Sequence, residues 1–182
     1  MSNFTSMLLD TIQGGAAPGT VPGLRYAEIA RKEDDGTYVL SWLSGAVRSD
    51  SAPARAAAFM AGGERGAYFP FEVGDEVVVG FIEGHQDQPV ILGALWSDQD
   101  KPPTDADTST SNNIRIIRSR EGSSVTFDDT QGATALKLKS AGGMEVTLDD
   151  KTKKLTIKFD ATTSIEMSSA GITVKGIKIN LN

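Results

Sequence analysis

Alternation of apolar and polar residues limits the possible folds of this sequence more than any other feature, and it runs through residues 112–182. A period of two places successive side chains on opposite faces of a β-strand. The pattern predicts about eight short strands, each with one apolar face: Ile114–Ile116, Val125–Phe127, Leu136–Leu138, Met144–Leu148, Leu155–Phe159, Ile165–Met167, Ile172–Val174 and Ile177–Leu181.

Residues that favour turns separate these segments about every ten residues. They lie at Glu121–Ser124, Asp128–Gly132, Ala141–Gly143, Asp149–Lys151 and Ser168–Gly171. The phrase Val-Thr-Phe-Asp-Asp at residue 125 returns as Val-Thr-Leu-Asp-Asp at residue 146, 21 residues later, and Ile157 follows Leu136 at the same interval. Such repetition predicts stacked units that bury their apolar faces only against neighbours.

The predicted strands are too short, and carry too few apolar side chains, to close a core from one chain. Two arrangements remain open: a single-chain solenoid with about 21 residues per coil, or several chains that pair one another's strand edges around a shared apolar axis. Eight strands stacked at about 4.8 Å would make a needle roughly 40 Å long. The side chains expected to face the axis are Val125, Phe127, Leu136, Leu138, Val146, Leu148, Leu155 and Ile157.

Charge divides the chain into two parts. The net charge of −6 is the sum of −9 over residues 1–111 and +3 over residues 112–182, and the change falls in a stretch rich in Pro, Ser, Thr and Asp. We therefore expect an N-terminal segment and linker at 1–21, a domain at 22–100, a linker at 101–113 and a repeat domain at 114–182. Because the chain has no cysteine, disulfides and thiolate metal sites are excluded.

The N-terminal residues give weaker signals. Phe4, Leu8 and Ile12 lie four apart, which predicts either a short amphipathic helix over Asn3–Gln13 or a frayed terminus. No apolar run is long enough to span a bilayer, and the basic start of a secretion signal is missing, so we expect synthesis in the cytoplasm.

Five further strands are predicted before residue 100, at Leu24–Ala30, Tyr38–Leu43, Ala67–Phe69, Val77–Ile82 and Pro89–Trp96. Tight turns are expected at Gly74-Asp75 and at Gly84–Asp87, and the stretch from Ser44 to Glu64, rich in Ala, Gly and Ser, predicts a long mobile loop with or without a helical turn. Five strands in some 75 residues fit a small barrel of the oligonucleotide/oligosaccharide-binding (OB) type.

Four phrases of this region make a family resemblance specific: Glu64–Phe69, Glu72–Val79, Asp87–Leu95 and Asp100–Pro103. In order and spacing they resemble the OB domain of phage baseplate spike proteins of the gpV class and are similar to the VgrG spikes of type VI secretion. The phrase Ile116–Asp129 resembles the one that opens a triple-stranded β-helix in that family. The resemblance covers residues 22–182, and Pro70-Phe71 depart from the family's more frequent Leu-Pro.

The resemblance implies an all-β chain with an N-terminal OB-fold barrel followed by a C-terminal intertwined trimeric β-helix needle. It implies a homotrimeric central spike of a contractile phage tail or related injection particle, which plugs the hub and tube and punctures the target cell envelope on contraction. We expect it in a virion tail baseplate or an injection particle. No hub-like or lysozyme-like domain is recognised, so we expect a hub protein from another polypeptide on the barrel side, and no enzymatic activity or cofactor.

The end of the sequence predicts a further partner. Some members of the resembled family bind iron at the tip through His-x-His, but this chain has no histidine after His85, so no metal is expected there. The apolar positions Ile177, Ile179 and Leu181 continue to the penultimate residue and would leave an apolar end exposed. We expect a small tip protein, such as a PAAR-repeat cap, on residues 176–182.

Other site hypotheses are weaker. The acidic barrel would repel nucleic acid, and His85 in a turn beside Asp87 has no nucleophile placed by motif. The pairs Asp128-Asp129 and Asp149-Asp150 could be glycosidase carboxylates or ion ligands, but turn residues explain them better. Arg65-Gly66 is a candidate basic site, although a close strand crossing at Gly66 and an ion pair for Arg65 are the simpler interpretations.

Two alternatives to a spike remain. One is a trimeric β-helical tail fibre that binds or degrades surface polysaccharide, which would need an aromatic groove, although Phe127 and Phe159 are the only aromatic residues of the repeat. The other is a monomeric solenoid scaffold.

Overall fold

The computed structural model describes residues 21, 23–43 and 50–180. Apart from one 3-10 turn, every regular element in this part of the chain is a β-strand, so the expected all-β class is confirmed. The chain divides into two compact units, residues 1–99 and 100–182. The helix expected over residues 3–13 lies outside the described residues. None of the described segments forms a helix long and apolar enough to cross a membrane.

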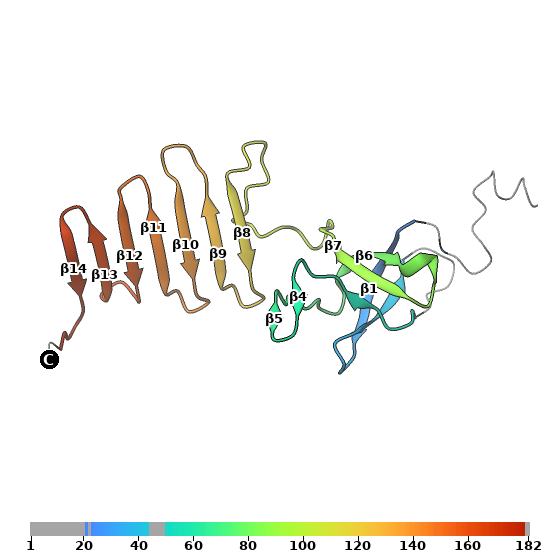
Figure 1. Ribbon diagram of the computed structural model, residues 1–182. Helices are drawn as coiled ribbons and strands as arrows, with labels where there is room; N and C mark the ends of the chain where they lie inside the picture. Colours follow the sequence, from blue (N-terminus) through green and yellow to red (C-terminus); the bar gives the residue numbers. More distant parts are fainter. Residues whose placement is uncertain (1–20, 22, 44–49, 181–182) are drawn as a thin grey trace, which may run out of the picture. The chain divides into compact units, whose positions relative to one another are not determined.

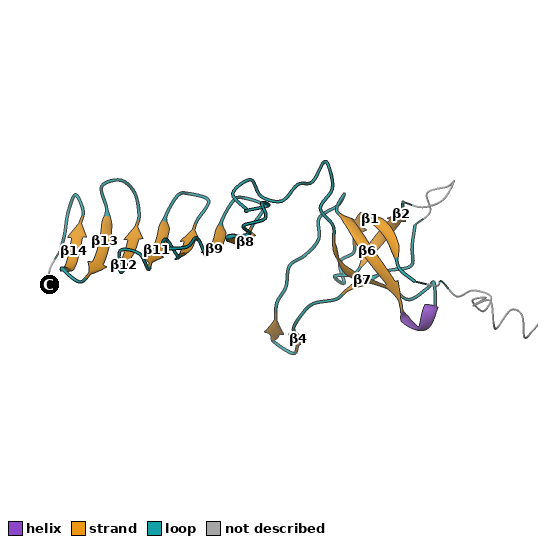
Figure 2. Ribbon diagram, turned by 90° about the horizontal axis from the view of Figure 1, so that it is seen from above, coloured by secondary structure: helices purple, strands orange, loops and turns teal. Residues whose placement is uncertain are grey.

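The first unit is built on a five-stranded sheet in the order β2-β1-β6-β7-β3. Four strands pair antiparallel, and the short β3 joins β7 in parallel. Bulges in β1 and at the β6–β7 pairing bend the strands, and the sheet curls into a half-barrel consistent with an OB fold (Figure 2). The bounds are β1 (Arg25–Lys32), β2 (Tyr38–Trp42), β3 (Arg55–Ala56), β6 (Glu76–Phe81), the 3-10 turn η1 (Ile82–Gly84) and β7 (Pro89–Ala94).

The concave face of this sheet carries the core. Alternate residues of β1, β2, β6 and β7 point inward, and they pack with Ala54 into one buried cluster: Ala27, Ile29, Tyr38, Leu40, Trp42, Val77, Val79 and Ile91. Phe71 packs edge-on against Tyr38, with ring centroids 5.7 Å apart, and its backbone N–H donates to the Tyr38 hydroxyl at 3.1 Å. The guanidinium of Arg25 covers the Trp42 ring at 5.7 Å.

The segment between β3 and β6 differs from the prediction. The strand expected at Ala67–Phe69 is wrong: a hairpin forms just before it, from β4 (Ala61–Gly62) and β5 (Arg65–Gly66). No helical turn occurs in residues 50–64, while residues 44–49 lie outside the described part. The N–H of Ala57 donates to the carbonyl of Ile91 at 2.8 Å, so pairing with β7 overrides the helix propensity of the alanine run.

The second unit is a single antiparallel sheet of seven five-residue strands that follow one another in sequence order (Figure 1). The strands are β8 (Ile114–Arg118), β9 (Ser124–Asp128), β10 (Ala135–Lys139), β11 (Glu145–Asp149), β12 (Lys154–Lys158), β13 (Ser164–Ser168) and β14 (Gly171–Lys175). Five of the six connections lie at predicted turn residues, and the connection at 159–163, between β12 and β13, was not predicted. Each of the strands β9 to β13 hydrogen-bonds to the strands before and after it in the chain.

One predicted strand is wrong, one alternative is excluded, and the sequence repeat does not follow the register of the sheet. The expected eighth strand is absent from the described residues 176–180. Antiparallel pairing of sequence neighbours excludes a solenoid with 21-residue coils. The first residues of β9 and β11 are 21 residues apart, as in the sequence repeat. In the next pair of strands the repeat fails: Leu136 of β10 is aligned, through Leu148, with Leu155 of β12, which is 19 residues later, and not with Ile157. The connections differ in length, so sequence spacing does not keep the register.

Pairing of strands between chains also differs from the expectation. Strands β9 to β13 have both backbone edges occupied by neighbours of the same chain, and only β8 and β14 are edge strands of this sheet. The inner strands therefore have no free edge for a second polypeptide. Any assembly with other copies must use the faces of the sheet, the ends of its strands, or these two edges.

Replacing Tyr38 by Phe should destabilise the first unit by about 1 kcal/mol, because the partly buried N–H of Phe71 loses its acceptor. Urea unfolding followed through tryptophan fluorescence measures this, since Trp42 lies in the core while Trp96 is already largely exposed in the folded chain. Tyr68→Phe is the matched control: the Tyr68 hydroxyl accepts from Lys32 at the surface, so its loss should cost no more than about 0.5 kcal/mol. Equal effects of the two substitutions would contradict this account of the core.

Candidate functional site

One face of the second sheet is apolar from β9 to β14. Residues directly opposite each other in neighbouring strands lie on the same face. Leu136 is opposite Phe127 and Leu148, and the row continues through Leu155, Met167 and Ile172. We call this surface the apolar face; its members are Ile117, Val125, Phe127, Leu136, Leu138, Val146, Leu148, Leu155, Ile157, Ile165, Met167, Ile172 and Val174.

The structure places all eight residues that were expected to face an axis on the apolar face. Sequence reasoning missed five further members, Ile117, Ile165, Met167, Ile172 and Val174, although the same alternation identifies the last four. In β8 the phase of the alternation was wrong. Ile114 and Ile116 lie opposite Asp128 and Thr126 on the other face, and Ile117 lies opposite Val125 on the apolar face.

Within residues 100–180, no segment of the second unit covers the apolar face. The sheet is a single layer (Figure 1), and no described residue from 100 to 180 is buried. Ile172 is 70% exposed, and even Leu148 in the middle of the sheet is 46% exposed. A continuous apolar surface of this extent marks an interaction site.

The opposite face is polar and suited to water. A central row runs through Thr126, Lys137, Thr147, Thr156, Glu166 and Thr173. Diagonal ion pairs link neighbouring strands, with 3.2 Å between Lys154 and Glu166 and 3.7 Å between Lys137 and Asp128. The sheet is therefore amphipathic, with one face that requires cover and one that does not.

Aspartates organise the turns at the strand ends, which confirms their interpretation as turn residues. Asp128 accepts from the N–H of Thr130 at 3.1 Å, and Asp149 accepts from that of Thr152 at 3.0 Å. The second member of each pair forms an ion pair, Asp129 with Arg115 and Asp150 with Lys153. Within the described residues no group of His, Cys, Asp and Glu side chains could hold a metal ion.

The hydrogen bonds at these turns lower carboxyl pKa values. The Thr130 hydroxyl, with smaller help from its N–H and from Lys137, lowers the pKa of Asp128. The N–H of Thr152, followed by its hydroxyl, does the same for Asp149. For Asp160, in the turn after β12, the pKa is lowered first by the N–H of Thr162.

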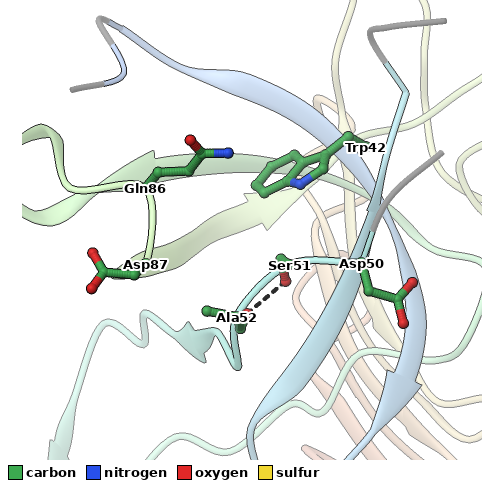
Figure 3. Close-up of a pocket in the computed structure, with 6 residues that line it drawn as sticks. All are labelled: Trp42, Asp50, Ser51, Ala52, Gln86 and Asp87. Carbon is green, nitrogen blue, oxygen red and sulfur yellow. Dashed lines mark hydrogen bonds between the residues drawn. The ribbon is translucent and has the colours of Figure 1, made fainter. Parts of the chain in front are cut away.

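In the first unit a depression lies between β2, the residues before β3 and the turn before β7. Its lining residues are Trp42, Asp50, Ser51, Ala52, Gln86 and Asp87. Figure 3 shows the carboxylates of Asp50 and Asp87 on opposite sides and pointing apart. Asp50 pairs with Arg31 at 3.0 Å, and the Ser51 hydroxyl donates to the carbonyl of Ala52 at 2.6 Å. His85 is exposed and is not among the lining residues. These residues do not form a paired-carboxylate or nucleophile–base arrangement.

The C-terminal end of the second sheet is open. All five residues of β14 are exposed, and one backbone edge of this strand has no partner within the described chain. Beyond it Ile177 is 92% exposed and Ile179 50% exposed. Leu181, the third residue expected at the tip, lies outside the described residues.

The comparison with protein families identifies the first unit. Residues 39–96 match the model of the type VI secretion system/phage-baseplate injector OB domain. The chain carries an OB domain of this injector family. The match runs from β2 past β7 and includes Trp42, Val77, Val79 and Ile91 of the core. The expected relation to gpV- and VgrG-like proteins is thereby confirmed, with the match covering the OB domain. No curated protein matches the chain.

This injector OB domain connects the chain with the spike of a phage baseplate or a type VI secretion system, and with a location in a virion tail or injection system. The matched residues lie entirely within the first unit. The apolar face of the second unit is thus a feature that the family match does not describe.

Acid should destabilise the turns of the second unit. Because hydrogen bonds in the folded chain hold the pKa values of Asp128, Asp149 and Asp160 below their ordinary value of 3.8, the contribution of these groups to stability is complete above about pH 4 and is lost as the pH falls through the folded values. Thermal unfolding by circular dichroism from pH 7 to pH 3 measures the loss. Replacing all three by Asn should lower the midpoint at pH 7 and reduce its fall in acid; an unreduced fall would contradict the assignment.

Proposed function

We propose that this chain is the structural central spike of a contractile phage tail or related injection particle, and that it acts as a homotrimer. The injector OB domain supports this proposal by its family. The observation that carries the trimer is the uncovered apolar face, because it gives the second unit a reason to require other copies of itself.

Three copies suit the dimensions of this sheet. A five-residue strand is about 17 Å long, and six spacings of about 4.8 Å make the seven-stranded sheet about 29 Å tall. Three walls about 17 Å wide that form a triangle stand about 5 Å from its axis. This distance is half of the roughly 10 Å that separates packed sheets, so the side chains of three walls fill the interior. Two walls face to face would leave both long sides of the apolar layer open to water.

In this proposal each chain contributes one complete wall of a three-sided needle, a β-helix in which the walls meet at the turns. Every strand is already hydrogen-bonded to its own neighbours, so only the apolar faces and the turns meet between chains. The rigidity of such a needle comes from geometry. No wall can bend locally without exposing the apolar interior that all three walls share.

The mechanical role follows from that rigidity. The barrel end contacts a hub protein and plugs the tube, and the needle transmits the force of contraction to the envelope of the target cell. No chemical step and no cofactor is part of the proposal. The tip is covered by a PAAR-like protein, which the open edge of β14 and the exposed Ile177 and Ile179 support, because a bare strand edge beside apolar side chains recruits a partner.

The oligomeric state tests the proposal directly. Analytical ultracentrifugation of the purified chain should give about three times the monomer mass of 19.3 kDa. Ile157→Asn should dissociate the assembly, because an unpaired amide inside the needle costs about 3 kcal/mol in each chain. Thr156→Asn is the matched control on the polar face and should leave the mass unchanged. A monomeric or dimeric mass for the wild-type chain would contradict the proposed trimer.

The tip contact has its own test. Removing residues 176–182 should abolish co-purification of a co-expressed PAAR-repeat protein, because the truncation removes Ile177 and Ile179. The mass of the truncated chain should still be that of the trimer, since these residues lie outside the seven strands. Retention of the PAAR-repeat protein by the truncated trimer would place the cap elsewhere.

A further inference from the structure

The hairpin between β3 and β6 receives little support from its own unit. We call residues 55–69 the arm; they contain β4 and β5, joined by only two residue pairs. Every residue from Arg55 to Gly66 is exposed, and Phe59 is 85% exposed. Figure 2 shows β4 lying away from the five-stranded sheet. An isolated two-stranded hairpin is marginal in water, so the arm has the character of a segment that another surface completes.

The arm nevertheless has a defined local structure. A Cβ on Gly66 would lie 2.7 Å from the carbonyl oxygen of Met60, and a Cβ on Gly62 would lie 2.7 Å from Nε of Arg65. The first contact confirms the close strand crossing expected at Gly66. The ion pair expected for Arg65 is not found among the described residues: its side chain crosses Gly62 instead.

The apolar side chains of the arm lie on both of its legs. Phe59 and Met60 precede the hairpin, and Tyr68 and Phe69 follow it, all more than half exposed. Tyr68 is fixed at the base of the arm, where its hydroxyl accepts from Lys32 at 3.2 Å. The free part of the arm therefore carries Phe59 and Met60 on one leg and Arg65 on the other.

A second apolar patch lies on the outward face of the five-stranded sheet. Tyr26 and Val78 face each other across β1 and β6 on the side opposite the core. Leu24 and Leu92 meet over Gly80, where a Cβ would lie 3.7 and 3.5 Å from them. Leu24, Tyr26 and Leu92 are each more than half exposed. We call these residues the outer patch.

The arm and the outer patch have complementary charges. The arm carries two arginines against one glutamate, whereas the rest of residues 21–99 carries four Lys and Arg against eleven Asp and Glu, a net charge of −7. Beside the outer patch, Glu28 lies directly opposite Glu76 across β1 and β6. These two carboxylates add to the negative charge of this surface, and a positively charged arm is complementary to such a surface.

The geometry points to the outer patch of a neighbouring copy as the surface on which the arm docks, with Phe59 and Met60 on Tyr26 and Leu92 and with Arg65 beside Glu28 and Glu76. The arm and the outer patch are different surfaces, so the contact is head-to-tail. Contacts of this kind close into a ring when the rotation from one copy to the next is a full turn divided by the number of copies. This inference rests on the proposed trimer, in which three such contacts would join the barrels independently of the needle.

Cysteine cross-linking tests the contact, because the natural chain has no cysteine. The double variant Tyr26→Cys, Phe59→Cys should form disulfides between chains under mild oxidation and give a covalent trimer on a non-reducing gel. A disulfide within one chain runs as a monomer on the same gel, so the gel distinguishes it from a link between copies. A second pair, Leu24→Cys with Met60→Cys, tests a docking position in which the arm is displaced along the outer patch.

Asp34→Cys with Phe59→Cys is the control, since Asp34 is exposed in the turn after β1, and it should remain unlinked. The variant Phe59→Ser, Arg65→Glu should lower the thermal midpoint of the assembled trimer by several degrees. Its tryptophan emission spectrum before unfolding should equal that of the natural chain, which shows that the core around Trp42 is intact.

The outcomes separate this inference from the proposed function. If the chain has the mass of a trimer but neither cysteine pair forms a link between copies, the arm contact is wrong and the proposed spike is unaffected. Links within one chain overturn it as well. If Phe59→Ser, Arg65→Glu leaves the trimer midpoint unchanged but abolishes binding of a hub protein, the hub occupies the arm and the contact between copies is wrong. A monomeric wild-type chain overturns both proposals.

Discussion

The second unit of this chain depends on one constraint: its apolar face has no covering layer. Thirteen apolar side chains lie on one side of a single sheet, and no described residue of the unit is buried. The hydrophobic effect favours any assembly that removes this surface from water. The narrow strands, the polar outer face and the turns rich in aspartate are all consistent with a wall whose inner side meets other walls.

The two units meet the need for burial in different ways. In the first, the sheet curls so that β1, β2, β6 and β7 bury Ile29, Leu40, Val77 and Ile91 against one another, and the chain completes its own core. In the second, tight turns keep seven strands in one layer, and the core has to come from elsewhere. In the proposed spike, the first unit is the part that docks, and the sheet of the second unit, assembled with other copies, is the part that gives rigidity.

Polar residues in the second unit serve the strands and turns. The paired aspartates that could have suggested a glycosidase bind backbone N–H groups or neighbouring cations, and each is accounted for by a turn or an ion pair. The charged residues of the outer face pair diagonally across strands, as Lys154 does with Glu166. They therefore stabilise the turns and the register of the strands on the polar face of the sheet.

The sequence by itself determined seven strands of the second unit, five of its six turns and, from β9 onward, its two faces, because a period of two and turn residues are local properties that survive without tertiary context. It also determined the injector OB domain, through phrases that the family match bears out. Eight of the thirteen residues of the apolar face were predicted from alternation alone. Only the tertiary structure decided how the strands pair, since register depends on the length of each connection: it joined neighbours into a meander and left residues 176–180 outside the sheet. It also placed Ile117 rather than Ile114 on the apolar face, because the register of β8 against β9 decides which residues share that face. It formed the arm at residues 55–69, whose base is fixed by the hydrogen bond from Ala57 to the distant Ile91, a contact that no local pattern records.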